Sequence, residues 1–295
     1  MRPEPLRSKD KEINFAPDFR HVPLGSGIRS EAMRKTNFHT HTARCGHAAG
    51  SDEEYVLSAL RGGFCELGFS DHTPWPYPSG FVSPIRMTPD ELDGYVASVR
   101  RLAERYRDRI RLRVGLECEY FDAYMPWLRE TIRRCRLDYV LFGNHYYPSD
   151  EHAPYFGHET RSPEMLERYT ESAVEGMETG LFACLAHPDL FMRSYAPFDR
   201  HCERASRRIC RTAARLRIPL EYNVSMIAAD ERRRWQGVPH PGFWQIAADE
   251  GCTAVIGMDA HDHMALESGV YYDRAVRTLA GLNIPTVDTL PFFEY

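Results

Sequence analysis

The sequence has no apolar run of the about 18 residues that a membrane-spanning helix needs. Its first residues, MRPEPLRSKDKEINF, lack the apolar core of a secretory signal. Its eight cysteines are scattered along the chain without a CxxC pair, which is typical of reduced thiols rather than of a disulfide framework. These absences predict a cytoplasmic protein with no membrane partner.

The sequence also lacks an excess of positive charge. Its 37 basic and 42 acidic residues give a formal net charge of −5, so no overall field attracts nucleic acid, and we expect no nucleic-acid partner. An anionic ligand would have to be captured by local cations. There is no G-x-S-x-G element of a serine hydrolase. The 295 residues, 43% hydrophobic and 27% charged, suit a globular protein with a sizeable core.

Strand-like and helix-like segments alternate seven times from Lys35 onward. Capping boxes mark two helix starts, at Ser51 with Glu54 and at Thr88 with Glu91. The predicted strands are Lys35–Phe38, Glu66–Phe69, Ile110–Leu116, Tyr139–Phe142, Phe182–Leu185, Leu220–Val224 and Thr253–Ile256. This alternation predicts an α/β protein with a parallel sheet, and seven units favour a single closed or nearly closed barrel. An open doubly wound sheet is the alternative. We interpret residues 1–34 as an N-terminal extension, partly disordered, and residues 35–295 as the barrel domain.

Residues of the kind that bind metal ions follow six of the seven predicted strands. They are His39, His41, His47, His72, Glu117, His145, His187, Asp259 and His261. The carboxyl ends of the strands of a β/α barrel meet on one face, where the active sites of such barrels lie. A single histidine at a strand end is usually structural, but this combination predicts a metal site on that face.

The local spacings agree with a shared site. In His39-Thr40-His41 the two imidazoles project to one side of an extended backbone, and Asp259-Ala260-His261 repeats this arrangement. Mixed imidazole and carboxylate ligands suit zinc, iron or manganese better than calcium or magnesium. We interpret Cys45 as a spectator beside the cluster, with a thiolate ligand as the alternative.

Seven ordered motifs carry a resemblance to a known family. They are NFHTHTARCGHA, GGFCELGFSDHTPWP, GLECEYF, DYVLFGNHYYP, AHPDL, EYNVS and GMDAH. Together they resemble the PHP superfamily of metal-dependent phosphoesterases, and most closely its histidinol-phosphate phosphatase branch. The resemblance covers Asn37 to about Leu266. It implies a distorted (β/α)7 barrel with the metal site at the C-terminal ends of the strands.

The resemblance also implies up to three divalent metal ions. A first ion would be surrounded by His39, His41, Glu117 and Asp259; Glu117 would bridge to a second ion held by His145 and His187; and His47, His72 and His261 would hold a third. The implied reaction is hydrolysis of a phosphate monoester by metal-activated hydroxide. The implied substrate is L-histidinol phosphate, cleaved to L-histidinol and phosphate in histidine biosynthesis.

Four other side chains are expected to assist this reaction. Arg44 and Arg193 follow strand ends and are candidates to hold the phosphate, and Asp71 is a candidate to orient a metal-bound histidine or to carry a proton. Glu119 is a candidate to pair with the ammonium group of the substrate.

Two departures from the family pattern leave other functions open. Met258 stands where a serine that contacts phosphate is usual, and Asn144 precedes His145. A PHP-type phosphoesterase acting on nucleotides or other small phosphate esters is therefore the main alternative. An amidohydrolase-type enzyme on a similar barrel, and a metal-binding protein without catalysis, are the others.

Overall fold

Eight parallel strands form one sheet in the computed structural model, which describes residues 34–233 and 237–295. The strands lie in sequence order: β1 (Thr36–Asn37), β2 (Glu66–His72), β3 (Arg111–Cys118), β4 (Tyr139–Gly143), β5 (Leu185–Ala186), β6 (Leu220–Asn223), β7 (Ala254–Gly257) and β8 (Thr286–Val287). The predicted extension before Arg34 lies outside the described residues. The predicted α/β class and parallel sheet are confirmed.

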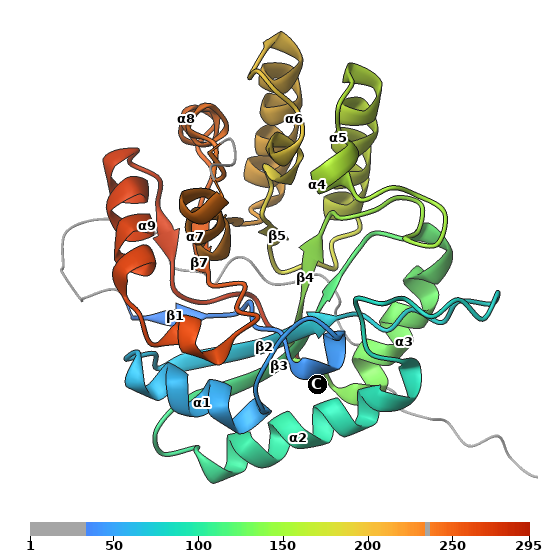
Figure 1. Cartoon of the computed structure of the whole chain (residues 1–295), viewed down its shortest axis with the longest axis vertical. Helices are drawn as coiled ribbons and strands as arrows, with labels where there is room; N and C mark the ends of the chain where they lie inside the picture. Colours follow the sequence, from blue (N-terminus) through green and yellow to red (C-terminus); the bar gives the residue numbers. More distant parts are fainter. Residues whose placement is uncertain (1–33, 234–236) are drawn as a thin grey trace, which may run out of the picture.

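The helices cover the outside of the sheet (Figure 1). They are α1 (Asp52–Arg61), α2 (Leu92–Arg105), α3 (Met125–Cys135), α4 (Phe156–Glu159), α5 (Pro163–Glu178), α6 (Arg200–Leu216), α7 (Val224–Arg233), α8 (Pro241–Asp249) and α9 (Val270–Gly281). The capping box predicted at Ser51 and Glu54 is present at the start of α1. None of the helices in the described part of the chain has the length and apolar character to span a membrane.

The sheet curls until its first and seventh strands approach each other. The backbone nitrogen of His41 donates to the carbonyl oxygen of Ala260 at 3.0 Å, and the nitrogen of Ala260 donates to the carbonyl of His39 at 3.2 Å. These bonds join the segments that follow β1 and β7, just beyond the strands themselves. The loops that carry the predicted ligands are therefore held beside each other by the backbone.

Two parts of the sequence fold differently from the prediction. The stretch Thr286–Leu290 was expected only to cover the C-terminus, but its first two residues form an eighth strand that pairs with β7. The strand predicted to end at Val224 ends at Asn223, and α7 begins directly after it. The count of seven strands is thus not reproduced.

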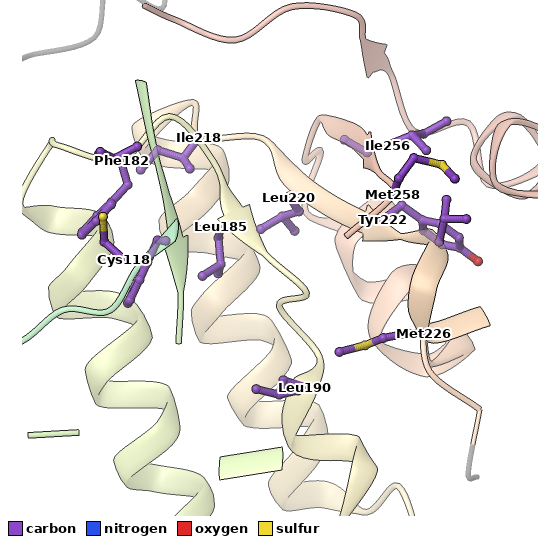
Figure 2. Close-up of a cluster of buried hydrophobic side chains, with 14 of the residues drawn as sticks. Cys118, Phe182, Leu185, Leu190, Ile218, Leu220, Tyr222, Met226, Ile256 and Met258 are labelled. Carbon is purple, nitrogen blue, oxygen red and sulfur yellow. The ribbon is translucent and has the colours of Figure 1, made fainter. Parts of the chain in front are cut away.

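Apolar side chains fill the space between the sheet and its helices. Leu185, Leu220 and Ile256 come from the neighbouring strands β5, β6 and β7 and belong to one buried cluster with Phe182 and Leu190 (Figure 2). Burying a side chain of this size stabilises the fold by about 1.5–3 kcal/mol. This packing fixes the strands from which the site residues project.

Tyr139, the first residue of β4, is fully buried and joins three strands. Its hydroxyl donates to the carbonyl oxygens of Phe38 at 2.6 Å and Phe69 at 3.2 Å, so one side chain ties β4 to the segments of β1 and β2. Glycines at positions 68 and 115 make room for it, because a Cβ would lie 2.2 Å from the Tyr139 hydroxyl at Gly68 and 2.7 Å from its ring at Gly115.

Candidate metal centre

The nine predicted ligands lie at or just beyond the carboxyl ends of the strands. His72 is the last residue of β2, and Glu117 is the last but one of β3. His145 and His187 follow β4 and β5. The loops after β1 and β7 supply the other five, which are His39, His41, His47, Asp259 and His261. All except His47, Asp259 and His261 are buried.

Glu117 lies at the centre of the cluster, and its two oxygens face different histidines. Oε2 lies 3.4 Å from Nε2 of His39 and 3.5 Å from Nε2 of His41. Oε1 lies 2.9 Å from Nε2 of His187 and 3.3 Å from Nε2 of His145. A carboxylate placed in this way can bridge two cations, one on the side of each oxygen.

The histidines on each side of Glu117 face each other through their ring nitrogens. Nε2 of His39 lies 3.1 Å from Nε2 of His41, and Nε2 of His145 lies 3.2 Å from Nε2 of His187. Two neutral imidazole lone pairs repel each other at this distance, so each pair needs a proton or a cation. A divalent ion beside each pair would satisfy both nitrogens.

A third group gathers around His261. Ligand atoms of His41, His72 and His261 all lie within 4.8 Å of one another, and so do those of Cys45, His47 and His261. The ring centroids of His47 and His261 are 4.6 Å apart. The structure therefore brings all nine predicted residues together in one continuous cluster.

Buried polar atoms without partners indicate that the cluster suits cations. Within the part of the chain that the structure describes, Nδ1 of His41 and His72, Nδ1 of His187, Oε2 of Glu117 and Nε2 of His261 make no hydrogen bond. A buried polar group without a partner costs free energy, and native proteins satisfy nearly all of them. Five such atoms in one cluster of imidazoles and carboxylates fit the donor set of divalent metal ions.

The pKa values of the two carboxylates in the cluster also suit metal binding. Burial alone would raise the pKa of Glu117, but the imidazoles of His145, His39 and His72 outweigh it and hold that pKa well below its usual range. Burial likewise opposes ionisation of Asp259, and His39 and His41 hold its pKa well below the usual value. Both carboxylates are thus ionised and available as ligands.

Two of the histidines are kept neutral. Burial, followed by the charge on His41, lowers the pKa of His72 to about 4 and that of His261 to about 3. A neutral imidazole offers the lone pair that a metal ion needs. These two side chains are therefore ready to bind a metal at neutral pH.

Buried carboxylates hydrogen-bond the outer nitrogens of two of the histidines, and a third carboxylate lies close to the outer nitrogen of His41. Nδ1 of His39 lies 2.7 Å from Glu221, and Nδ1 of His145 lies 3.0 Å from Glu119. Nδ1 of His41 lies 3.5 Å from Oδ1 of Asp71. Metal-binding histidines commonly have such a carboxylate partner, which fixes the ring and its tautomer. Asp71 was predicted to orient a histidine, and its carboxylate lies near the ring of His41 and accepts a hydrogen bond from the backbone nitrogen of His72 at 2.8 Å.

Glu221 was not predicted as a site residue. Besides contacting His39, it accepts a hydrogen bond from the backbone nitrogen of His187 at 3.0 Å and one from Nδ2 of Asn223, also at 3.0 Å. Gly257 makes room for it, because a Cβ at that position would lie 1.8 Å from Oε1 of Glu221. The available signal was the acidic residue of the EYN motif, which lies within the one predicted strand that supplied no ligand.

Glu221 and Asn223 also support two strained backbone positions. His187 has φ 30° and Asp259 has φ 46°, a region that costs a residue with a side chain about 1–3 kcal/mol. The Glu221 carboxylate holds the backbone of His187, and Nδ2 of Asn223 donates to Oδ2 of Asp259 at 3.1 Å. Strain of this kind persists where neighbouring groups fix it, and it is common at functional sites.

The contacts of Arg44 do not favour its predicted role in holding phosphate. Both terminal nitrogens pair with the carboxylate of Asp52, at 2.8 and 2.9 Å, and Nη1 also donates to Thr42. Arg44 lines a cavity of about 770 Å³ between the loop after β1 and helices α1 and α2, and none of the nine clustered residues lines that cavity. The pairing of Arg44 with Asp52 could not be predicted from the spacing of residues in this loop.

The contacts of Glu119 also differ from its predicted role. Its buried carboxylate accepts hydrogen bonds from Nε1 of Trp75 at 2.9 Å and from Arg86 at 3.0 and 3.1 Å, in addition to its contact with His145. Arg86 continues to Asp150 at 3.0 Å. Both oxygens of Glu119 are occupied, so we revise its role from pairing with substrate to orienting His145.

Arg193 is linked to the cluster through Tyr155. Its Nη1 donates to the hydroxyl of Tyr155 at 3.0 Å, and its Nη2 lies 3.2 Å from Nε2 of His158. The ring of Tyr155 lies 6.0 Å from the ring of His145. Arg193, Tyr155 and His158 thus form a group of hydrogen-bonding side chains next to the predicted ligands of one ion.

The two departures from the family pattern face away from the cluster. The side chain of Met258 belongs to the buried hydrophobic cluster, near Tyr222 and Ile256 (Figure 2). Asn144 donates to the carbonyl of Tyr169 and accepts from Ser172, both on α5. Neither residue contacts the predicted metal ligands through its side chain in the described structure.

Comparisons with known proteins find relatives of this chain by sequence and by fold. The sequence model of the PHP domain family matches residues 37–225. A protein of Deinococcus radiodurans named "Probable histidinol-phosphatase" is 29% identical over 227 residues, covering 76% of this chain and 85% of that protein. The histidinol-phosphatase of Bacillus subtilis is 29% identical over 115 residues, covering 34% of this chain and 43% of that protein.

One solved structure has a similar fold over its whole length. The histidinol phosphate phosphatase of Lactococcus lactis, crystallised with zinc, L-histidinol and phosphate, superposes with a TM-score of 0.68. The match covers 90% of this chain and 100% of that protein, with 16% sequence identity. At this identity the likeness concerns the fold.

Proposed function

The chain belongs to the PHP domain family, and we propose that it hydrolyses L-histidinol phosphate to L-histidinol and phosphate at a metal centre built from the nine clustered side chains. The observation that carries the proposal is the position of Glu117, whose two oxygens face two separate pairs of histidines. The names of the similar proteins support the choice of substrate.

We assign the ligands of up to three zinc, iron or manganese ions by the family pattern. His39, His41 and Asp259 would hold the first ion, His145 and His187 the second, and Glu117 would bridge them. His47, His72 and His261 would hold the third. The centre would lie at the carboxyl ends of the strands of a distorted (β/α)7 barrel, with β8 as an addition to the seven-strand pattern. When bound, such ions neutralise charge on the phosphoryl group and activate water for attack on phosphorus.

The protein's own residues would position the substrate. Arg193 is the candidate to bind the phosphate oxygens. Its guanidinium donates to the hydroxyl of Tyr155, and the ring centroid of Tyr155 lies 6.0 Å from that of His145. The rings of Tyr146 and Tyr155, whose centroids are 5.5 Å apart, offer aromatic surface for the imidazole of the substrate. Asp71 would orient His41, and we propose no direct substrate contact for Arg44 or Glu119.

The main alternative substrate class has lost its support. Met258 and Asn144 were the features that favoured nucleotides or other small esters, and both side chains point away from the cluster. The cytoplasmic location and the absence of a nucleic-acid partner stay predictions from the sequence.

Phosphate release by the metal-replete protein tests the proposal. L-histidinol phosphate is compared with a panel of nucleotides and sugar phosphates, and we expect its kcat/KM to exceed the others by orders of magnitude. Strong turnover of another ester with weak turnover of histidinol phosphate would reject the substrate and leave the metal centre standing. Hydrolysis of an amide but of no phosphate ester would reject the reaction class.

A further inference from the structure

We propose that Cys45 is a thiolate ligand of the third metal ion, which adds sulfur to a centre otherwise made of imidazoles and carboxylates. This inference rests on the metal centre proposed above. Cys45 ends the short helix η2 (Ala43–Cys45), and its side chain is fully buried. One ligand atom each of Cys45, His47 and His261 lie within 4.8 Å of one another.

The backbone of the loop turns His47 back toward Cys45. Gly46 has φ 77°, a left-handed conformation that turns the chain back directly after Cys45. Nδ1 of His47 then donates to the carbonyl oxygen of Cys45 at 2.9 Å. Because Nδ1 carries the proton in this bond, Nε2 of His47 keeps its lone pair for a metal ion.

His261 is oriented in the same manner from the other side. Its Nδ1 lies 3.1 Å from the carbonyl oxygen of Asp259, so its Nε2 also keeps a lone pair. That Nε2 atom makes no hydrogen bond among the described residues. His72, whose side chain is only 7% exposed, has a ligand atom within 4.8 Å of one ligand atom each of His41 and His261.

The distances suit a single ion with a sulfur ligand. A zinc–sulfur bond of about 2.3 Å and zinc–nitrogen bonds of about 2.0–2.1 Å at tetrahedral angles place the ligand atoms of one ion roughly 3.3–3.6 Å apart. Ligand atoms within 4.8 Å of one another therefore need to move by no more than about 1.5 Å on binding. Thiolate is a soft ligand, so this position would favour zinc or cobalt over manganese.

A second buried cysteine, Cys118, is adjacent in sequence to the predicted bridging ligand Glu117. Its sulfur lies 2.8 Å from the hydroxyl of Thr73, and it packs in the hydrophobic cluster (Figure 2). The sulfur of Cys45 also has one ligand atom each of His41 and Asp71 within 4.8 Å. A hydrogen bond from the thiol to His41 is therefore the competing role, and the experiment must separate the two.

Cobalt binding to the full-length protein separates them. The metal is removed with a chelator, Co²⁺ is added, and the near-ultraviolet absorption of thiolate-to-cobalt charge transfer is recorded together with the bound cobalt per chain. We expect the band in the wild type and in Cys65→Ser, whose exposed thiol serves as the matched control. Cys45→Ser should lose the band and bind one equivalent of cobalt at least about 10-fold more weakly.

Four outcomes would overturn the inference. Cobalt bound by the wild type without a charge-transfer band would leave the metal centre intact and reject sulfur ligation, whether or not the variant folds. A band that persists in Cys45→Ser would assign it to another thiol. Weaker cobalt binding by the variant, with no band in the wild type, would assign Cys45 to the hydrogen bond with His41. Failure of the wild type to bind any cobalt would reject the metal centre itself.

Discussion

Replacing Gly257 by alanine should disable the metal centre without touching any predicted ligand. The new Cβ would lie 1.8 Å from Oε1 and 2.4 Å from Cδ of Glu221, far inside the about 3.5 Å at which such atoms normally meet. Because the obstruction is on the carboxylate itself, Glu221 must move by more than an ångström. That movement breaks its 2.7 Å contact with His39 and its hydrogen bond to the backbone of His187.

Two magnitudes follow from this displacement. Overpacking of a tight site typically lowers the free energy of unfolding by about 1–3 kcal/mol. Loss of the partner that orients a metal-binding histidine typically lowers metal affinity by about 10–100-fold, and here ligands of two ions are affected. We therefore expect Gly257→Ala to fold, with reduced stability, and to lose activity at metal concentrations that saturate the wild type.

Competition with a chromophoric chelator measures the affinity, and urea unfolding of the metal-free protein measures the stability. Gly94→Ala is the matched control, because nothing lies within 4 Å of a Cβ there and alanine in α2 should be neutral or stabilise by up to about 1 kcal/mol. Wild-type metal affinity in Gly257→Ala, measured in a protein whose stability has fallen as expected, would refute the role of Glu221 in orienting His39.

Three further predictions follow from other contacts of the site. Treatment with a chelator should abolish phosphate release and lower the melting temperature, and added zinc should restore both; activity that survives in protein shown to be metal-free would refute the centre. Arg193→Ala should lower kcat/KM about 10–100-fold, because it removes a hydrogen bond to a charged group. Arg44→Ala should leave KM unchanged, and equal effects of the two substitutions would contradict the assignment of Arg193 to phosphate binding. Burial raises the pKa of Asp189 to about 6, above its unfolded value, so the stability that its protonation gives is present below about pH 4 and is lost as pH rises to about 6. Asp189→Asn should remove this loss, which is on the order of 1–3 kcal/mol. Urea unfolding at pH 4 and pH 7 measures it, and the same difference in unfolding free energy in the variant as in the wild type would contradict the prediction.

The elements that the sequence predicted well are those with local signals. The capping box at Ser51 and Glu54 places the start of α1, because both partners lie within one turn of each other. The helix α7 was missed because the apolar residues after the EYN motif continue the strand pattern, although Asn223 supplies a local helix-start signal by accepting from the backbone nitrogen of Met226 at 3.0 Å. The strand β8 is two residues long, too short to show a period.

The metal ligands could be predicted from the sequence, but the residues that orient those ligands could not, for a physical reason. A ligand such as His145 is recognisable because it follows a buried strand, and strand ends are visible in the sequence. Its partner Glu119 was assigned to the substrate because its true contacts come from Trp75 and Arg86, which are 44 and 33 residues away along the chain. Contacts at such separations depend on how the loop after β2 folds over β3, which no local pattern encodes.

The residues that orient the histidines nevertheless follow one chemical rule, and this rule explains why the cluster needs cations. Carboxylates hold the outer nitrogens of His39 and His145, and because a carboxylate can only accept, the proton of each ring lies on Nδ1. The Nε2 lone pairs of both rings must then point inward. There each meets another imidazole nitrogen at 3.1 or 3.2 Å and an oxygen of Glu117 at 3.4 or 3.3 Å, all of them electron-rich. Glu221 and Glu119 thus make the arrangement stable only when positive charge lies between those atoms, and divalent ions supply that charge with the directional bonds that neutral imidazoles can form.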